Sequence, residues 1–371
     1  MIIVNPVTCD LTNIDRHLST ANPGEEVHLP AGAYATRGAW GYPGYRMIHG
    51  RLVGAGSETA VYLDDPTDTI PTDKGDVAAA YYEMLTGGHK VVLNRGIRVE
   101  DMRLVATASK PVKAIHIWGA ESVVSGVTVD GIWGDAKILE GEGFGIIVNA
   151  GGDPTLQGGN VIENCTVNAR RGSYFCGIYL GIESPFPQVI NRVSRCVVRA
   201  TANNDIPPTG VGFGVNSDIV IEDCQTMNVS RPIFSDTGGG NDVVVRRLRA
   251  NGCGTAIEFQ GKSSRDSRRR ILIEDCDFIH GDTGAGFVAG LVLAYIKDPT
   301  LAGTPPPRMD DIVVRNCRFY NESGTPGHIG SSQIAPNGRQ PRFQGCTFIG
   351  DWNGDQARDA KWTFEGCEFR K

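Results

Sequence analysis

A short motif recurs along most of the chain and constrains its fold more than any other feature. It reads apolar, any residue, Asp/Asn/Gly/Arg, Cys, any residue, apolar, as in Ile162-Glu163-Asn164-Cys165-Thr166-Val167. Ten copies are centred on residues 102, 127, 165, 196, 224, 248, 276, 317, 346 and 367, so that successive centres lie 21 to 41 residues apart. A repeat with a short minimum period and variable insertions is typical of a solenoid whose coils carry loops.

A second apolar run precedes most copies of the motif. Examples are Ala114-Ile115-His116-Ile117-Trp118 and Gly177-Ile178-Tyr179-Leu180. Apolar residues that alternate with other residues predict strands, with the isoleucines and leucines pointing inward. Coils of two or three short strands in this order cannot form hairpins, so the pattern predicts stacked coils with parallel pairing.

Seven of the ten cysteines occupy the same position of the repeat. We expect them to stack inside the solenoid as small hydrophobic residues. Parallel Cβ vectors on neighbouring coils do not favour disulfide geometry, so the sequence predicts free, buried thiols. The chain has no Cys-x-x-Cys pair, which argues against a zinc site.

The N-terminal region resembles a known superfamily. The segment Asn22-Pro23-Gly24-Glu25-Glu26-Val27-His28-Leu29-Pro30-Ala31-Gly32-Ala33-Tyr34 and the repeated coils are similar to the pectin-lyase-like, right-handed parallel β-helix superfamily. The resemblance covers residues 20–371. It implies an all-β fold, a single-stranded right-handed parallel β-helix (solenoid) of about ten or more coils with loop insertions. It also implies an N-terminal capping helix, for which residues 11–20 have an amphipathic pattern.

The expected organisation is one structural domain. Residues 1–33 would form the N-terminal cap and entry strand, and residues 34–371 the parallel β-helix. The expected insertions span residues 64–90, 132–143, 298–310 and 321–340, with shorter loops at 151–159, 202–209 and 262–270. The basic run Arg268-Arg269-Arg270 is expected to be a solvated turn.

Charge and composition exclude several classes of function. The net charge of −6 argues against nucleic-acid binding, which needs an excess of Lys and Arg. No apolar run approaches the roughly 18 residues of a membrane span. The N-terminus lacks the charged and apolar regions of a Sec signal. Free thiols fit synthesis in a reducing cytoplasm, so we expect a cytoplasmic or virion location.

The strand upstream of each motif predicts two rows of outward side chains. The first row is His116, Ile147, Tyr179, Gly214, Phe234, Glu258 and Val292, and the second is Trp118, Asn149, Gly181, Asn216, Asp236, Gln260 and Ala294. Aromatic faces stack on sugar rings and amides bond hydroxyls, so this mixture suits a glycan. The predicted substrate-binding residues are His116, Trp118, Asn149, Tyr179, Asn216, Gln260 and Lys262.

Two carboxylates in these rows are the candidate catalytic residues. Asp236 and Glu258 lie on adjacent coils, about 8 Å apart along the backbone. Inverting glycosidases separate their acid and base by about 6.5–9.5 Å. A lyase would instead need a base such as Lys262, Arg231, Tyr179 or His116. The Asn-Thr-Asp and Gly-His-Gly signatures of polygalacturonases are absent.

Several functions remain consistent with these residues. The favoured one is a glycan-binding protein of a phage tail, with or without glycoside hydrolase or polysaccharide lyase activity. One alternative is a cellular polysaccharide lyase, hydrolase or epimerase, and another is an intracellular enzyme on a small substrate. The expected partners are a bacterial surface or other polysaccharide and virion tail proteins, with a homotrimer as one assembly. No cofactor is required, and no motif supports Ca²⁺.

Overall fold

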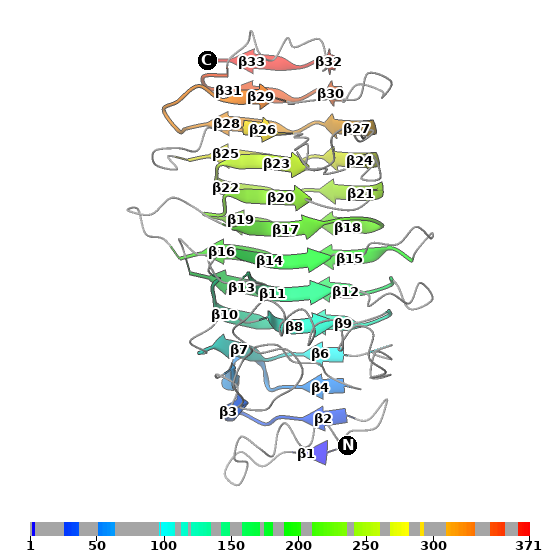
Figure 1. Ribbon diagram of the computed structural model, residues 1–371, viewed down its shortest axis with the longest axis vertical. Helices are drawn as coiled ribbons and strands as arrows, with labels where there is room; N and C mark the ends of the chain where they lie inside the picture. The colour runs from blue at the N-terminus through cyan, green and yellow to red at the C-terminus, as the bar shows by residue number, and fades with distance from the viewer. Residues whose placement is uncertain are drawn as a thin grey trace, which may run out of the picture. The chain divides into compact units, whose positions relative to one another are not determined.

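The computed structural model describes residues 2–3, 26–36, 51–63, 96, 98–107, 113–117, 120–134, 142–148, 158–170, 174–180, 189–201, 210–235, 241–259, 268–281, 290–292, 309–330, 342–352 and 363–371. The chain divides into two compact units, unit 1 (Met1–Tyr179) and unit 2 (Leu180–Lys371). Each unit is a right-handed parallel β-helix built from three parallel sheets (Figure 1), as the repeat predicts. The organisation into one structural domain stays a prediction.

Unit 1 contains strands of three sheets. The first sheet consists of β1 (Ile2–Ile3), β2 (Glu26–His28), β4 (Arg51–Val53), β6 (Arg98–Glu100), β9 (Val123–Ser125) and β12 (Val161–Glu163). The second consists of β3 (Gly32–Thr36), β5 (Thr59–Leu63), β7 (Arg103–Ala106), β10 (Thr128–Ile132) and β13 (Thr166–Ala169). The third contains β8 (Lys113–Ile117) and β11 (Gly143–Val148), and β14 (Phe175–Leu180) begins in this unit.

Unit 2 repeats this arrangement. Its first sheet consists of β15 (Asn191–Ser194), β18 (Ile219–Glu222), β21 (Asn241–Arg246), β24 (Arg268–Glu274), β27 (Met309–Arg315), β30 (Arg342–Gln344) and β32 (Thr363–Glu365). Its second consists of β16 (Val197–Ala200), β19 (Gln225–Met227), β22 (Arg249–Cys253), β25 (Asp277–His280), β28 (Arg318–Asn321), β31 (Thr347–Ile349) and β33 (Glu368–Arg370). Its third consists of β17 (Val211–Val215), β20 (Arg231–Ser235), β23 (Thr255–Phe259), β26 (Gly290–Val292) and β29 (His328–Gly330).

Some boundaries differ from the sequence-based expectation. The run Arg268-Arg269-Arg270, expected as a turn, begins strand β24, and β29 lies within the stretch 321–340 that was expected to be an insertion. Both strands pair in parallel with neighbouring strands. The described ranges contain one short 3₁₀ helix, η1 (Gly56–Glu58), and no helix long and apolar enough to cross a bilayer. The expected capping helix at 11–20 lies outside the described residues.

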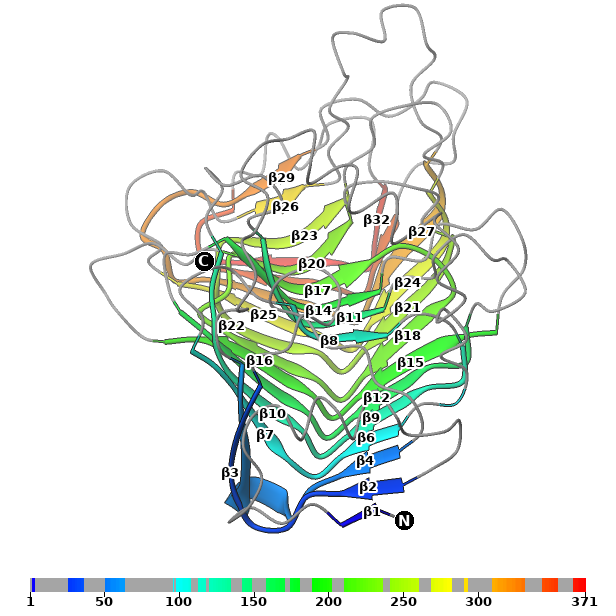
Figure 2. The ribbon, with the colours of Figure 1, turned by 60° about the horizontal axis from the view of Figure 1, so that its bottom comes forward.

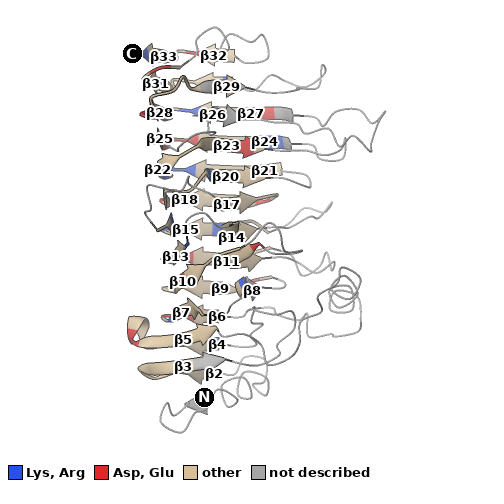
Figure 3. Ribbon diagram, turned by 60° about the vertical axis from the view of Figure 1, so that its left-hand side comes forward, with Lys and Arg blue, Asp and Glu red and all other residues tan. Residues whose placement is uncertain are grey.

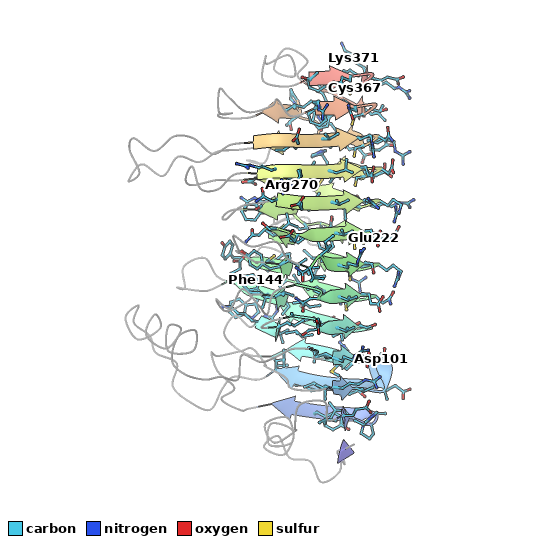
Figure 4. All side chains as sticks on the ribbon, turned by 90° about the vertical axis from the view of Figure 1, so that its right-hand side faces the viewer. Asp101, Phe144, Glu222, Arg270, Cys367 and Lys371 are labelled. Carbon is cyan, nitrogen blue, oxygen red and sulfur yellow. The ribbon has the colours of Figure 1, made fainter. Side chains whose placement is uncertain are left out.

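The repeated motif forms the corner between the first and second sheets. In all ten copies two residues separate the strands of these sheets. The first of the two has a positive φ of 50–65°, and eight of the ten are Asp, Asn or Gly, which tolerate the left-handed region best. These residues are Asp101, Gly126, Asn164, Arg195, Asp223, Arg247, Asp275, Asn316, Gly345 and Gly366. Asp101 is labelled in Figure 4.

The second corner residue points into the core. Met102, Val127 and Leu248 are buried there, as are six of the seven cysteines, whereas Cys367 is half-buried. The described cysteines are free thiols, as expected, and Cys9 lies outside the described residues. Each thiol at this position lies 3.2–3.7 Å from the carbonyl oxygen two residues earlier. Most also reach a carbonyl of the preceding coil, at 3.4–3.9 Å. The thiol is therefore a weak donor at a corner as well as a small apolar group.

Charged residues alternate along the outer face of the first sheet in unit 2. Glu222, Arg246, Glu274 and Arg315 lie in register on consecutive strands. Glu274 forms ion pairs with both arginines, at 2.9 Å from the Nε of Arg246. Figure 3 shows acidic and basic residues on neighbouring strands of this unit. The alternation places opposite charges on these four adjacent coils, and the row continues with the uncharged Ser194 and Gln344 on either side.

The left-handed corner can be tested at Asn164, whose φ is 53°. Replacing it with a β-branched residue, Asn164→Val, should lower the free energy of unfolding by about 1–2 kcal/mol, because the Cβ clashes in this region. Asn164→Gly should be close to neutral. Urea unfolding of both variants measures the difference. An equal loss in the two variants would show that side-chain contacts, and not backbone geometry, decide the preference.

A buried histidine gives the fold a pH dependence. His280 is fully buried, its Nδ1 lies 2.9 Å from the carbonyl oxygen of Gly254, and burial lowers its pKa to about 4 from 6.5. As pH falls below 6.5, the unfolded chain binds a proton that the folded chain does not accept until about pH 4. We therefore expect the free energy of unfolding to fall over this interval, by up to about 3 kcal/mol.

The control for this prediction is His280→Gln, which has no titrating ring. The stability difference between wild type and variant, measured by urea unfolding, should be constant above pH 7 and shrink between pH 6.5 and 4. A difference that is the same at every pH would contradict a neutral buried imidazole.

Candidate functional site

From β6 onward the coils vary in length on one side only, whereas the connections from β2 to β3 and from β4 to β5 have three and five residues. From the first to the second sheet the chain takes the short corner described above. The return from the second sheet to the first includes the third-sheet strand and the long connections, such as residues 149–157 in unit 1 and 293–308 in unit 2. Figure 2 views the stacked strands obliquely from one end and separates the three sheets. Variable connections on a rigid scaffold are where binding sites form, so the third sheet is the candidate face.

The structure confirms the register of the first predicted row from β8 to β11 and from β17 to β26. In unit 1 Ile147 pairs with His116. In unit 2 Gly214, Phe234, Glu258 and Val292 follow one another on consecutive strands. The alternate residues of these strands, such as Ile233 and Ile257, are buried in the core. The period-2 pattern therefore places the row on the side of the third sheet that faces away from the core.

Glu258 is the centre of a charged and aromatic cluster in unit 2. The Oε2 of Glu258 forms an ion pair with the Nε of Arg231 at 2.6 Å, and only 8% of Glu258 is exposed. The guanidinium of Arg231 also lies over the ring of Phe234, 5.1 Å from its centroid. The cluster holds a carboxylate, a guanidinium and an aromatic ring on two neighbouring strands, β20 and β23. We call Arg231, Phe234 and Glu258 the third-sheet cluster.

Asn216 follows β17, which pairs with β20, and it is buried. Its exposed fraction is 1%, and its Oδ1 accepts a hydrogen bond from the Oγ of Ser235 at 3.4 Å. Asn216 and Ser235 therefore bond to each other at the end of β17 and β20. Its predicted contact with a substrate stays a prediction.

Unit 1 places a second cation and two aromatic rings on the third sheet. Lys113 is only 7% exposed, and its Nζ lies 5.7 Å from the ring centroid of Phe144, with which it is in register. Phe144 meets Tyr179 edge to face, with 5.7 Å between centroids. In Figure 4, Phe144 lies on the opposite side of the strand stack from Asp101. The sequence pattern predicted Tyr179 as a site residue, whereas Lys113 and Phe144 precede the alternating part of their strands and were not predicted.

Most of the other predicted site residues lie outside the described residues. These are Asp236, Trp118, Asn149, Gln260 and Lys262, and of His116 only the backbone is described. Of the predicted catalytic pair the structure therefore describes Glu258 alone. The separation between the carboxylates of Asp236 and Glu258 stays a prediction.

Acidic residues at the entry to the first sheet have a structural role. Asp218, Asp242 and Asp311 have positive φ values of 55°, 57° and 52°. Both carboxylate oxygens of Asp242 bond to Arg270 at 2.5 Å. Burial raises the pKa of the Asp218 carboxyl, and the charge of Asp242 raises it further. Within the described ranges no three His, Cys, Asp or Glu side chains are grouped to hold a metal ion.

The strength of the Arg231–Glu258 pair can be measured by a double-mutant cycle. Arg231→Gln and Glu258→Gln should each destabilise the protein, and the coupling energy should be about 1–2 kcal/mol, because both side chains are partly desolvated. The matched control is the pair Arg370–Glu368, whose side chains are 63% and 59% exposed. Its coupling should be below about 1 kcal/mol. Equal coupling in the two pairs would show that the third-sheet pair is no more desolvated than a surface pair.

Solved structures share the fold of this chain. The catalytic domain of GH87 α-1,3-glucanase in complex with nigerose is 13% identical, with a TM-score of 0.52 over 99% of this chain and 68% of that one. The tailspike protein of E. coli bacteriophage HK620 in complex with pentasaccharide is 10% identical, with a TM-score of 0.57. That comparison covers 94% of this chain and 60% of the tailspike. No model of a protein family and no curated protein sequence matches the chain. The structural likenesses show that the chain has the parallel β-helix fold of these proteins.

Proposed function

We propose that this protein binds a glycan along the outward face of its third sheet. The observation that carries the proposal is the third-sheet cluster, in which Arg231, Phe234 and Glu258 are held together on two rigid strands. A guanidinium and a carboxylate bond to hydroxyl groups, and an aromatic face packs against the apolar face of a pyranose ring. Two β-helix proteins of similar fold, the glucanase and the tailspike, have structures in complex with oligosaccharides, which supports this ligand class.

Binding is tested on an array of bacterial O-antigen, capsular and α-1,3-glucan oligosaccharides. Wild type should bind at least one glycan. Phe234→Ala should weaken that binding about tenfold or more, because it removes the aromatic face and the support of Arg231. Absence of binding to every glycan on the array would refute the proposal.

We further propose that the cluster takes part in hydrolysis of the glycan. Glu258 would accept a proton from water as the water oxygen attacks the anomeric carbon. Asp236 would donate its proton to the leaving oxygen as the glycosidic bond breaks, so that the atoms and charges balance. Arg231 forms an ion pair with one carboxylate oxygen of Glu258, and this pair would fix the orientation of the other carboxylate oxygen. A lyase mechanism, with Arg231 or Lys262 as the base, is the alternative.

Hydrolysis is tested with Asp236→Asn and Glu258→Gln, which preserve shape and remove the charge. Each should lower kcat by about 10²-fold or more, since each removes a proton-transfer group. Glu222→Gln is the matched control, because Glu222 is an outward carboxylate of the first sheet that pairs with Arg247. Reducing-end assays on the bound glycan measure the rate, and an ultraviolet-absorbing unsaturated product would indicate the lyase alternative. Unchanged rates in both variants would exclude this carboxylate pair.

The virion is the proposed setting for this activity. A tailspike of E. coli bacteriophage HK620 shares the fold, which supports this setting. In that setting the protein would contact other tail proteins and could assemble as a homotrimer. Immunoelectron microscopy of the phage and light scattering of the purified protein test the two statements separately.

A further inference from the structure

A second corner of unit 1 lies between the second and third sheets, at the ends of β10 and β13 and the start of β14. We call it the Trp133 corner, and it combines features that the third-sheet cluster does not use. Tyr174, just before β14, is 45% exposed. The other strongly exposed large apolar residues in the described ranges are Val189, Ile190, Met227 and Phe369. Tyr174 is therefore the one tyrosine or tryptophan among them. A single exposed tyrosine is ordinary on a protein surface, so only its surroundings can indicate whether it binds a ligand.

Backbone hydrogen bonds fix this corner on three sides. The amide of Arg170 donates to the carbonyl of Ile132 at 2.7 Å, and the amide of Tyr174 donates to the carbonyl of Gly134 at 3.0 Å. Trp133 is therefore bracketed by Arg170 and Tyr174 of the next coil. The carbonyl of Tyr174 in turn accepts from Gly143, at 3.1 Å. A Cβ on Gly143 would lie 2.0 Å from the carbonyl oxygen of Trp133, so this contact has no room for a side chain.

Trp133 and Arg170 add polar groups to the corner. The guanidinium of Arg170 is exposed and lies 5.9 Å from the ring of Trp133. The indole Nε1 of Trp133 is buried without an acceptor among the described residues. An unsatisfied buried donor costs about 1–3 kcal/mol, and a buried water molecule that supplies an acceptor would remove this cost.

We infer that Trp133, Arg170 and Tyr174 form a carbohydrate subsite, separate from the third-sheet cluster. The apolar face of one pyranose ring stacks on Tyr174, and the guanidinium of Arg170 donates hydrogen bonds to the substituents of that sugar. The ring of Trp133, 5.9 Å from that guanidinium, helps to hold it in place. The rigid backbone holds the aromatic ring before the ligand arrives, so little entropy is lost on binding. This inference rests on the proposed glycan-binding function.

The test uses the full chain and the glycan that gives the strongest signal on the array described above. Tyr174→Ala should weaken binding about tenfold, whereas Tyr174→Trp should retain it, because it keeps a stacking face. Arg170→Gln should weaken binding about threefold or more, through the loss of a charged donor. Met227→Ala is the matched control, since Met227 is 40% exposed on the second sheet of unit 2, and it should leave affinity unchanged. Thermal melting confirms that each variant is folded.

The outcomes separate this inference from the proposed function. Weaker binding by Tyr174→Ala, with wild-type binding by Met227→Ala, supports the subsite. Wild-type affinity in Tyr174→Ala, together with weaker binding by Phe234→Ala, overturns the subsite and leaves the third-sheet proposal standing. If wild type binds no glycan on the array, both proposals fail.

Discussion

The two-residue corner between the first and second sheets is the constraint on which the rest of each coil depends. One residue must occupy the left-handed region, and the next must fill the core without forcing the sheets apart. Asp, Asn or Gly meets the first requirement at eight of ten corners. Cysteine meets the second at seven, and its thiol also lies beside carbonyl oxygens of the corner. The corner therefore selects the same kind of residue pair in coil after coil, and this recurrence makes the repeat visible in the sequence.

A corner that cannot change forces variation to the other side of the coil. From β6 onward, every connection of more than two residues between the described strands belongs to the return from the second sheet to the first. The strands there are short and in register, so a side chain such as Glu258 keeps a fixed position relative to Arg231 and Phe234. The constant corner thus helps to keep the coils rigid, as a binding site requires, while the third sheet carries the side chains of the candidate site.

The sequence predicts the backbone better than the site. The motif identifies every two-residue corner, and alternation correctly places Phe234 and Glu258 in one row, because both follow from steric rules that act within a few residues. It misses β29, whose strand His328–Gly330 is too short to show alternation. It also misses the start of β24, where Arg268 and Arg269 pair with β27 and Arg270 has a positive φ. It also misses the partner of Glu258 within the cluster and the Trp133 corner, because these contacts join residues of different coils. Asp236, the other predicted catalytic residue, lies outside the described residues, so its position rests on sequence alone.

The alternating ladder on the first sheet of unit 2 has a consequence for how such a chain changes length during evolution. Glu222, Arg246, Glu274 and Arg315 succeed one another coil by coil. Deletion of the single coil that carries Arg246 would bring Glu222 beside Glu274, and two like charges would face each other. Deletion of two successive coils, with Arg246 and Glu274, would bring Glu222 beside Arg315 and restore an attractive pair. Gene rearrangements in this part of the solenoid are therefore tolerated best when they remove or duplicate coils two at a time.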